Sequence, residues 1–105
     1  MPAHERRSQT RKQVQLPVKA RTTNKTEQQG LTRDLSSNGI FFYSDGALES
    51  GAKLELVVML PEGLGLPASG WTLCQASVVR VEKDHGKGVG VAATLDRIEV
   101  LPEIS

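Results

Sequence analysis

The chain has 105 residues, of which 38% are apolar and 24% charged, and its formal net charge is +1. This length provides for one small hydrophobic core and excludes an active site built between two domains. No apolar run approaches the length of a membrane span, and no basic start precedes a long apolar segment. We therefore expect a soluble, cytoplasmic protein without a secretion signal.

Charge is distributed unevenly along the chain. Residues 1–26 contain seven basic side chains and one acidic side chain, a net charge of +6, whereas residues 27–105 contain six and eleven, a net charge of −5. A basic arm on a mildly acidic body is expected of a chain that captures an anion at one end, although a solvated tail has the same composition.

The first predicted strand covers residues 14–21, where apolar residues alternate. One face carries Val14, Leu16, Val18 and Ala20. Pro17 has no N–H to donate to a neighbouring strand, so we expect this strand to lie at a sheet edge.

The polar residues 22–29 predict an exposed loop, and two more strands follow at residues 30–35 and 40–44. Strict alternation in the second strand would place Leu31 and Leu35 on one face. Its other face would carry Thr32 and Asp34.

The second half of the sequence also predicts strands separated by turns. A turn at residues 44–46 precedes a buried strand at 53–60, and the loop 61–70 is rich in glycine and proline. Residues 72–82 predict a long strand, and a β-bulge between Val78 and Val79 would reconcile its two apolar phases.

A final strand at residues 88–95 alternates cleanly and predicts a hairpin with the strand before it. Its glycines fit a loose dinucleotide-binding pattern, but such a pattern must open a helix, so close packing against Gly88 and Gly90 is the better reading. Asp96 would cap a short helix that Pro102 stops, with Ile98 and Leu101 on its apolar side.

These elements predict an all-β fold, a small six-stranded antiparallel barrel. We expect a flexible basic N-terminal arm at residues 1–13, a barrel domain at residues 14–105, and a short C-terminal helical turn. His4, His85 and Cys74 are too scattered to form a metal site or to supply a nucleophile and its base. We therefore expect no metal and no enzyme, and a buried structural role for Cys74.

Two short motifs carry the strongest functional signal. Arg7 and Arg11 lie four residues apart in the arm, and Asp34, Ser36 and Gly39 lie between two predicted strands. A guanidinium group matches phosphate oxygens and the O6/N7 edge of guanine, and it stacks on bases. A carboxylate suits the N1–H and amino donors of guanine, a hydroxyl can donate to a phosphate, and glycine adds no Cβ. Taken alone, the second motif is also ordinary turn chemistry.

In order, spacing and strand context, these motifs resemble the PilZ family of cyclic di-GMP receptors. The resemblance covers residues 5–11 and 14–18, then 34–41, and later the run Gly88-Val89-Gly90-Val91. It implies an antiparallel barrel, cyclic di-GMP as the ligand, and no cofactor. One departure is the pair Ala92-Ala93, where the family often has an aromatic or larger apolar residue.

The resemblance implies ligand contacts for six residues. They are Arg6, Arg7, Arg11, Asp34, Ser36 and Gly39. The second and third arginines would hold phosphates and guanine edges as the arm folds over the barrel, and the last three residues would surround a guanine. The first arginine would add a contact if the ligand binds as a stacked dimer. The role of Asn38, at a variable position of the motif, stays open.

We therefore expect a receptor that orders its arm over the barrel on binding and signals to a protein partner. Two alternatives stay open. One is a PilZ-like interaction module that binds no nucleotide. The other is a small nucleic-acid-binding barrel, which would usually carry more aromatic residues than the 4% present and a basic body. Nucleic acid is therefore not the expected partner.

Overall fold

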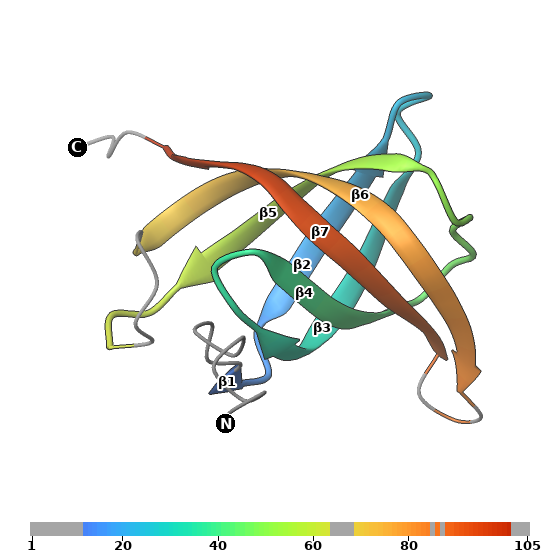
Figure 1. Cartoon of the computed structure of the whole chain (residues 1–105), viewed down its shortest axis with the longest axis horizontal. Coiled ribbons are helices and arrows are strands. Elements are labelled where there is room, and N and C mark those ends of the chain that lie inside the picture. Colours follow the sequence, from blue (N-terminus) through green and yellow to red (C-terminus); the bar gives the residue numbers. More distant parts are fainter. Residues whose placement is uncertain (1–11, 64–68, 85, 87, 102–105) are drawn as a thin grey trace, which may run out of the picture.

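The computed structural model describes residues 12–63, 69–84, 86 and 88–101, and the regular elements in these residues are all β-strands. They are β1 (Lys12–Gln13), β2 (Pro17–Thr22), β3 (Glu27–Leu35), β4 (Gly39–Ser44), β5 (Lys53–Leu60), β6 (Gly70–Asp84) and β7 (Gly88–Val100). Paired strands are antiparallel, in the order β1-β3-β2-β5-β6-β7-β4. Because β4 also pairs with β3, six strands close into a barrel and β1 is an additional strand beside β3 (Figure 1). The predicted six-stranded antiparallel barrel is confirmed.

Alternate residues of each strand fill the barrel interior. In β5 every second side chain is buried, as in Leu56 and Val58, and in β2 Val18 and Ala20 are buried. Cys74 also belongs to this core, as predicted. Since the interior is filled with side chains, functional groups must lie on the outer face or at the barrel ends.

The hairpin of β6 and β7 is the longest paired unit of the barrel. Its register shifts between Val78 and Arg80, which confirms the predicted bulge, and shifts again between Gln75 and Ala76. Each shift moves one extra residue into a strand and increases the local twist. The two bulges let this long hairpin curve around the barrel (Figure 1).

The predicted C-terminal helical turn is wrong for the residues that the structure describes. Residues 96–100 continue β7, because β6 is long enough to pair with them: Cys74 lies opposite Ile98 and Thr72 opposite Val100. The N–H of Leu101 then donates to the carbonyl oxygen of Trp71 at 2.9 Å. This ladder satisfies backbone groups that a two-turn helix would leave mostly unpaired. Pro102 lies outside the described residues.

Two predictions about β2 and its neighbour are also wrong. β2 is not an edge strand, since it pairs with both β3 and β5. Pro17 is tolerated because it is the first residue of the strand and the pairing with β5 begins at Val18. Residues 27–29 belong to β3 and not to a loop. The connection is a tight turn closed by the N–H of Thr22, which donates to the carbonyl oxygen of Thr26 at 3.0 Å.

β3 changes phase at Arg33. Thr32 lies opposite Phe42 and Asp34 opposite Phe41, so Arg33 is an extra residue with no partner of its own in β4. This bulge turns Leu31 outward, where it is 40% exposed, while Leu35 remains buried. The prediction that these two leucines share a face is therefore wrong, and Thr32 and Asp34 are buried.

Candidate functional site

The turn from β3 into β4 is held by Ser36. Its N–H donates to the carbonyl oxygen of Gly39 at 2.9 Å, and its Oγ accepts from the N–H groups of Asn38 (3.4 Å) and Gly39 (3.2 Å). The Ser36 side chain is buried. A hydroxyl that bonds nearby backbone in this way fixes the shape of a turn. Ser36 therefore has a clear structural role in this state of the protein.

A second contact fixes the turn to the far side of the barrel. The N–H of Leu95 in β7 donates to the carbonyl oxygen of Asn38 at 2.9 Å, and Gly39 is in register with Thr94. The turn is thus attached to β3, β4 and β7 together. Its backbone is held in place on the rim of the barrel, as a binding loop requires.

Arg33 and Asp34 form an ion pair at the bulge. Nε of Arg33 lies 2.9 Å from Oδ2 of Asp34, whose side chain is mostly buried, and the guanidinium carbon lies 3.8 Å from the centroid of the Phe41 ring. Hydrogen bonds from Arg33 to Asp34 and then to Tyr43 raise the pKa of the arginine above its ordinary value. The carboxylate and the aromatic ring hold the plane of the guanidinium between them.

Phe41 lies on the outer face of the barrel, apart from the interior cluster that contains its neighbours Ile40 and Phe42. It is nevertheless buried, and its ring packs directly on the backbone of Gly90 in β7. A Cβ added to Gly90 would lie 2.8 Å from Cζ of Phe41. The close approach predicted for Gly88 and Gly90 is confirmed, since a Cβ on Gly88 would likewise meet the backbone of Ser44.

These groups surround a pocket of about 390 Å³ on the outer rim of the barrel. Its lining comes from β3, the turn, β4, the bulge of β6 and the middle of β7. The residues are Arg33, Asp34, Ser36, Asn38, Gly39, Ile40, Phe41, Val79, Arg80, Ala92, Ala93 and Thr94. Small side chains on the β7 wall leave room, and polar groups gather on the β3 wall. We refer to this site as the motif pocket.

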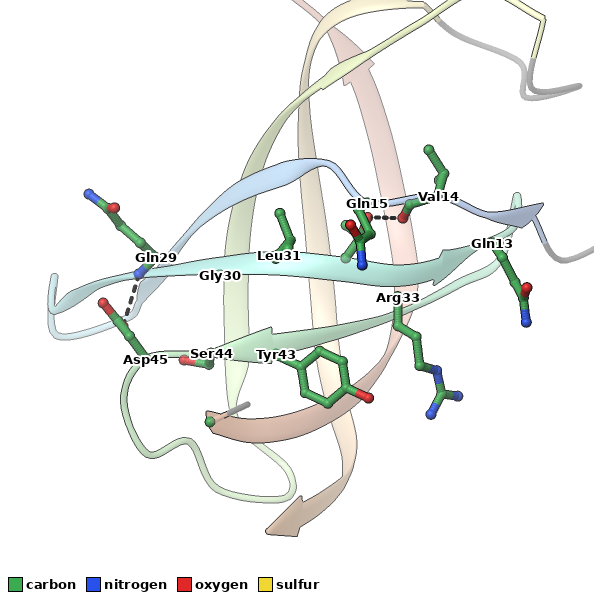
Figure 2. A pocket seen from close by; sticks show the side chains of 12 residues that line it. Gln13, Val14, Gln15, Gln29, Gly30, Leu31, Arg33, Tyr43, Ser44 and Asp45 are labelled. Atoms are coloured by element: carbon green, nitrogen blue, oxygen red, sulfur yellow. Dashed lines mark hydrogen bonds between the residues drawn. The ribbon is translucent and has the colours of Figure 1, made fainter. Parts of the chain in front are cut away.

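A larger open groove of about 920 Å³ adjoins the motif pocket, and Arg33 lines both. Figure 2 shows its walls: Arg33 and Tyr43 lie side by side on neighbouring strands, and Gln13 and Gln15 face them from the segment around β1. Leu31 lies in the middle of this groove. The groove therefore links the motif pocket to the outer face of β3.

The structure brings together three of the predicted site residues, Asp34, Ser36 and Gly39, as lining of one pocket. The predicted arginines Arg6, Arg7 and Arg11 lie outside the described residues. The strand that follows them directly, β1, is in register with the second motif, with Gln13 opposite Asp34. The chain therefore enters the described structure beside the motif pocket.

Most of the other lining residues were not predicted as site residues from the sequence. Among them are Arg33, Phe41, Arg80 and Ala92. Alternation within β4 could have placed Phe41 opposite to its buried neighbours. No local signal predicts that a residue of the β6 bulge reaches the same pocket.

The part of the chain that the structure describes offers little support for metal binding or for nucleophilic catalysis. No group of three or more potential metal-ligating side chains occurs there. Burial raises the pKa of the Cys74 thiol to about 11, so this thiol is protonated at neutral pH and is a poor nucleophile. The described residues contain no helix that is long and apolar enough to cross a membrane.

Comparison with known proteins agrees with this architecture. The sequence profile of the PilZ domain matches residues 5–100. The inhibitor of motility MotI (DgrA) of Bacillus subtilis superposes with a TM-score of 0.69 and 25% identity, over 94% of this chain and 49% of MotI. This chain thus corresponds to about half the length of MotI. No curated protein sequence matches.

Two further solved structures share the fold. The PilZ domain of YcgR from Escherichia coli, solved with cyclic di-GMP, superposes with a TM-score of 0.63 and 13% identity, over 87% of this chain and 78% of that one. The PilZ domain of CeSA from a cellulose-synthesizing bacterium gives 0.58 and 18%, over 84% and 82%. At these identities the likeness concerns the fold alone.

Proposed function

Because the chain belongs to the PilZ domain family, we propose that it is a receptor for cyclic di-GMP that binds the ligand in the motif pocket and signals to a protein partner. PilZ domains are receptor and adaptor modules rather than enzymes. The PilZ domain of YcgR was solved with this ligand, which supports the proposal.

The observation that carries the proposal is the position of β1. Gln13 lies opposite Asp34, so the chain enters the barrel beside the second motif, and Arg11 directly precedes this strand in the sequence. We infer that Arg7 and Arg11 contact the same ligand as Asp34. A ligand with two guanines and two phosphates needs this combination of donors and acceptors.

We assign a role to each group. Asp34 accepts hydrogen bonds from the N1–H and amino group of one guanine. Arg7 and Arg11 bind phosphates and a guanine edge as the arm closes over the barrel. Ser36 and Gly39 shape the turn so that the ligand can approach its backbone closely, and Arg6 supplies an additional cationic contact.

Arg33 presents a flat surface in the same pocket. Its guanidinium stacks on Phe41 with one face, and a purine base can stack on the other face. The ion pair with Asp34 keeps this plane in position before the ligand arrives. Closing the arm over a ligand then creates a surface that a partner can distinguish from the free protein.

Isothermal titration of the purified chain with cyclic di-GMP tests the proposal, with Arg7→Ala and Asp34→Ala as site variants. The matched controls are Arg21→Ala and Glu55→Ala, which remove the same charges from exposed positions on β2 and β5. We expect saturable binding that is lost in the site variants and kept in the controls. GTP and cyclic di-AMP, added as competitors, should displace the ligand poorly.

Absence of both heat and thermal stabilisation at high ligand concentration would overturn the proposal. The protein would then be a PilZ domain that interacts with other proteins without a nucleotide. Binding that survives Asp34→Ala but weakens steeply with salt would instead indicate general attraction of anions to the arm.

A further inference from the structure

A second exposed region lies on the outer face of β2, β5 and β6 and takes no part in the motif pocket. Trp71 is 54% exposed and Met59 42% exposed, although both belong to strands, Met59 near the end of β5 and Trp71 near the start of β6. Large exposed apolar side chains that gather on one surface mark an interaction site.

Strand register places these side chains in one row. Leu31 lies opposite Pro17, and Met59 lies opposite Trp71. The two pairs are neighbours, because the last recorded β2–β5 pair is Val18 with Val58, one position away. These two valines point into the core, so Pro17 and Met59 point outward.

The next outward row adds two more apolar residues. Val57 lies opposite Leu73, and both are half-buried. We call the six outward apolar residues of both rows the apolar face. They are Pro17, Leu31, Val57, Met59, Leu73 and Trp71. Because the barrel is closed and its interior already filled, this face cannot serve the fold's own core.

One cation lies at the border of the apolar face. Lys19 is outward and exposed, and its partners in the two neighbouring strands are Gln29 and Val57. No salt bridge to Lys19 is found among residues 12–63, 69–84, 86 and 88–101. An ammonium group at the border of an apolar surface is complementary to a carboxylate beside apolar side chains of a partner.

We propose that the apolar face docks a segment of another protein in which apolar side chains flank an Asp or Glu that pairs with Lys19. Aromatic residues and methionine are the types enriched in protein interfaces, and tryptophan is a typical hot-spot residue. Neither this docking nor its test depends on binding of cyclic di-GMP.

An anionic membrane surface fits less well, because such surfaces are bound by clusters of basic residues and the apolar face borders a single lysine. A second copy of this chain is the other candidate occupant, and the experiment below distinguishes it from a different protein.

A displayed library of random peptides, selected on the immobilised full chain, tests the proposal. We expect enriched peptides to share an acidic residue flanked by apolar residues. In fluorescence anisotropy with the purified peptides, Trp71→Ser should weaken binding at least about 30-fold, since hot-spot truncations cost about 2 kcal/mol or more and 1.4 kcal/mol is tenfold. Met59→Ser should also weaken it.

Charge reversal sharpens the test. Lys19→Glu should weaken binding about tenfold or more, and a peptide with lysine in place of its acidic residue should bind this variant better than the native chain. Val100→Ser is the matched control, because Val100 is 51% exposed on β7 and belongs neither to the apolar face nor to the motif pocket. Thermal unfolding of each variant checks that it is folded.

Three outcomes would overturn the proposal. The enriched peptides could be basic, or they could bind Trp71→Ser and the native chain equally. Sedimentation could also reveal a dimer of the native chain that Trp71→Ser dissociates, which would make the occupant a second copy.

Discussion

The motif pocket and the apolar face lie on the same barrel but are built in opposite ways. In the motif pocket, polar side chains already bond to one another, as in the pair of Arg33 and Asp34, and the β7 wall carries small side chains. On the apolar face, large side chains project outward and Lys19 is a cation at its border. The first arrangement suits a small polar ligand that needs fixed donors and acceptors. The second suits a broad macromolecular surface.

A chain of contacts connects the two regions. Leu31 of the apolar face lies opposite Tyr43, whose ring meets that of Phe41 edge to face at 5.6 Å between centroids. Phe41 in turn lies beneath Arg33 of the motif pocket. Substitutions on either side can therefore establish whether the two regions are independent.

Asp34→Asn should have the largest effect, because it should change the ligand selectivity of the motif pocket and leave the apolar face unaffected. The amide keeps the shape of the side chain but loses the charge and one acceptor, so the preference for cyclic di-GMP over cyclic di-AMP should fall. Hydrogen bonds to charged groups contribute about 1.5–3 kcal/mol, which corresponds to roughly 10- to 100-fold. Titration with both ligands measures the ratio. Trp71→Ser should leave this ratio unchanged, and an equal fall in both variants would contradict the separation.

Gly90→Ala should destabilise the wall of the motif pocket. The added Cβ would lie 2.8 Å from Cζ of Phe41, and the ring is confined between Gly90 and Arg33. Overpacking of this kind costs about 1–3 kcal/mol in the free energy of unfolding. Urea unfolding measures the loss.

Gly46→Ala is the control for that substitution. Its added Cβ would also lie 2.8 Å from a neighbour, but the neighbour is the end of the Gln28 side chain, which can move. If both alanine variants lost the same stability, confinement of Phe41 would not be the cause.

Arg33→Ala should have a smaller effect on stability, about 1 kcal/mol, because it removes a partly exposed stack and ion pair. Affinity for cyclic di-GMP should fall in the same variant, since Asp34 loses its positioning partner. Arg21→Ala is the comparison, as it loses only an exposed pair with Glu27 at 3.8 Å and lies outside the motif pocket. Identical stabilities and affinities of the two variants would argue against a special role of Arg33.

Trp71→Ser should have the smallest effect on folding. The tryptophan is largely exposed, so the free energy of unfolding should change by no more than about 0.5 kcal/mol. Thermal unfolding checks this value. A loss of several kcal/mol would mean that Trp71 supports the fold, and its exposure could then not be assigned to docking.

Sequence reasoning succeeded where one strand carries a complete pattern. The strand at residues 88–95 alternates, so Val91 and Ala93 could be placed on its buried face, and the apolar run at 53–60 predicted a buried strand. It failed where the conformation of a strand depends on the partner strand with which it pairs. The extension of β7 to Val100 depends on the length of β6, and the phase change at Arg33 depends on pairing with β4. A bulge leaves no reliable mark in a short polar strand.

The candidate site divides in the same way. Asp34, Ser36 and Gly39 could be predicted because they form a contiguous motif in a turn. Phe41 and Arg80 join the motif pocket through strand order and through the β6 bulge, which no local pattern encodes. The apolar face was also missed, because its rows run across strands and become visible only once the register is known.

β1 is only two residues long, yet its pairing with β3 fixes the point at which the preceding residues are attached to the barrel. Lys12 and Gln13 are in register with Leu35 and Asp34. A residue extends a chain by at most about 3.6 Å, so connectivity alone keeps Arg7 within roughly 18 Å of Lys12. Groups on so short a tether act at a local concentration in the millimolar range, and the cost of closing the loop grows only with the logarithm of its length. The proposed function therefore predicts that affinity for cyclic di-GMP changes with the number of residues between the arginines and β1, while every residue proposed to touch the ligand stays the same.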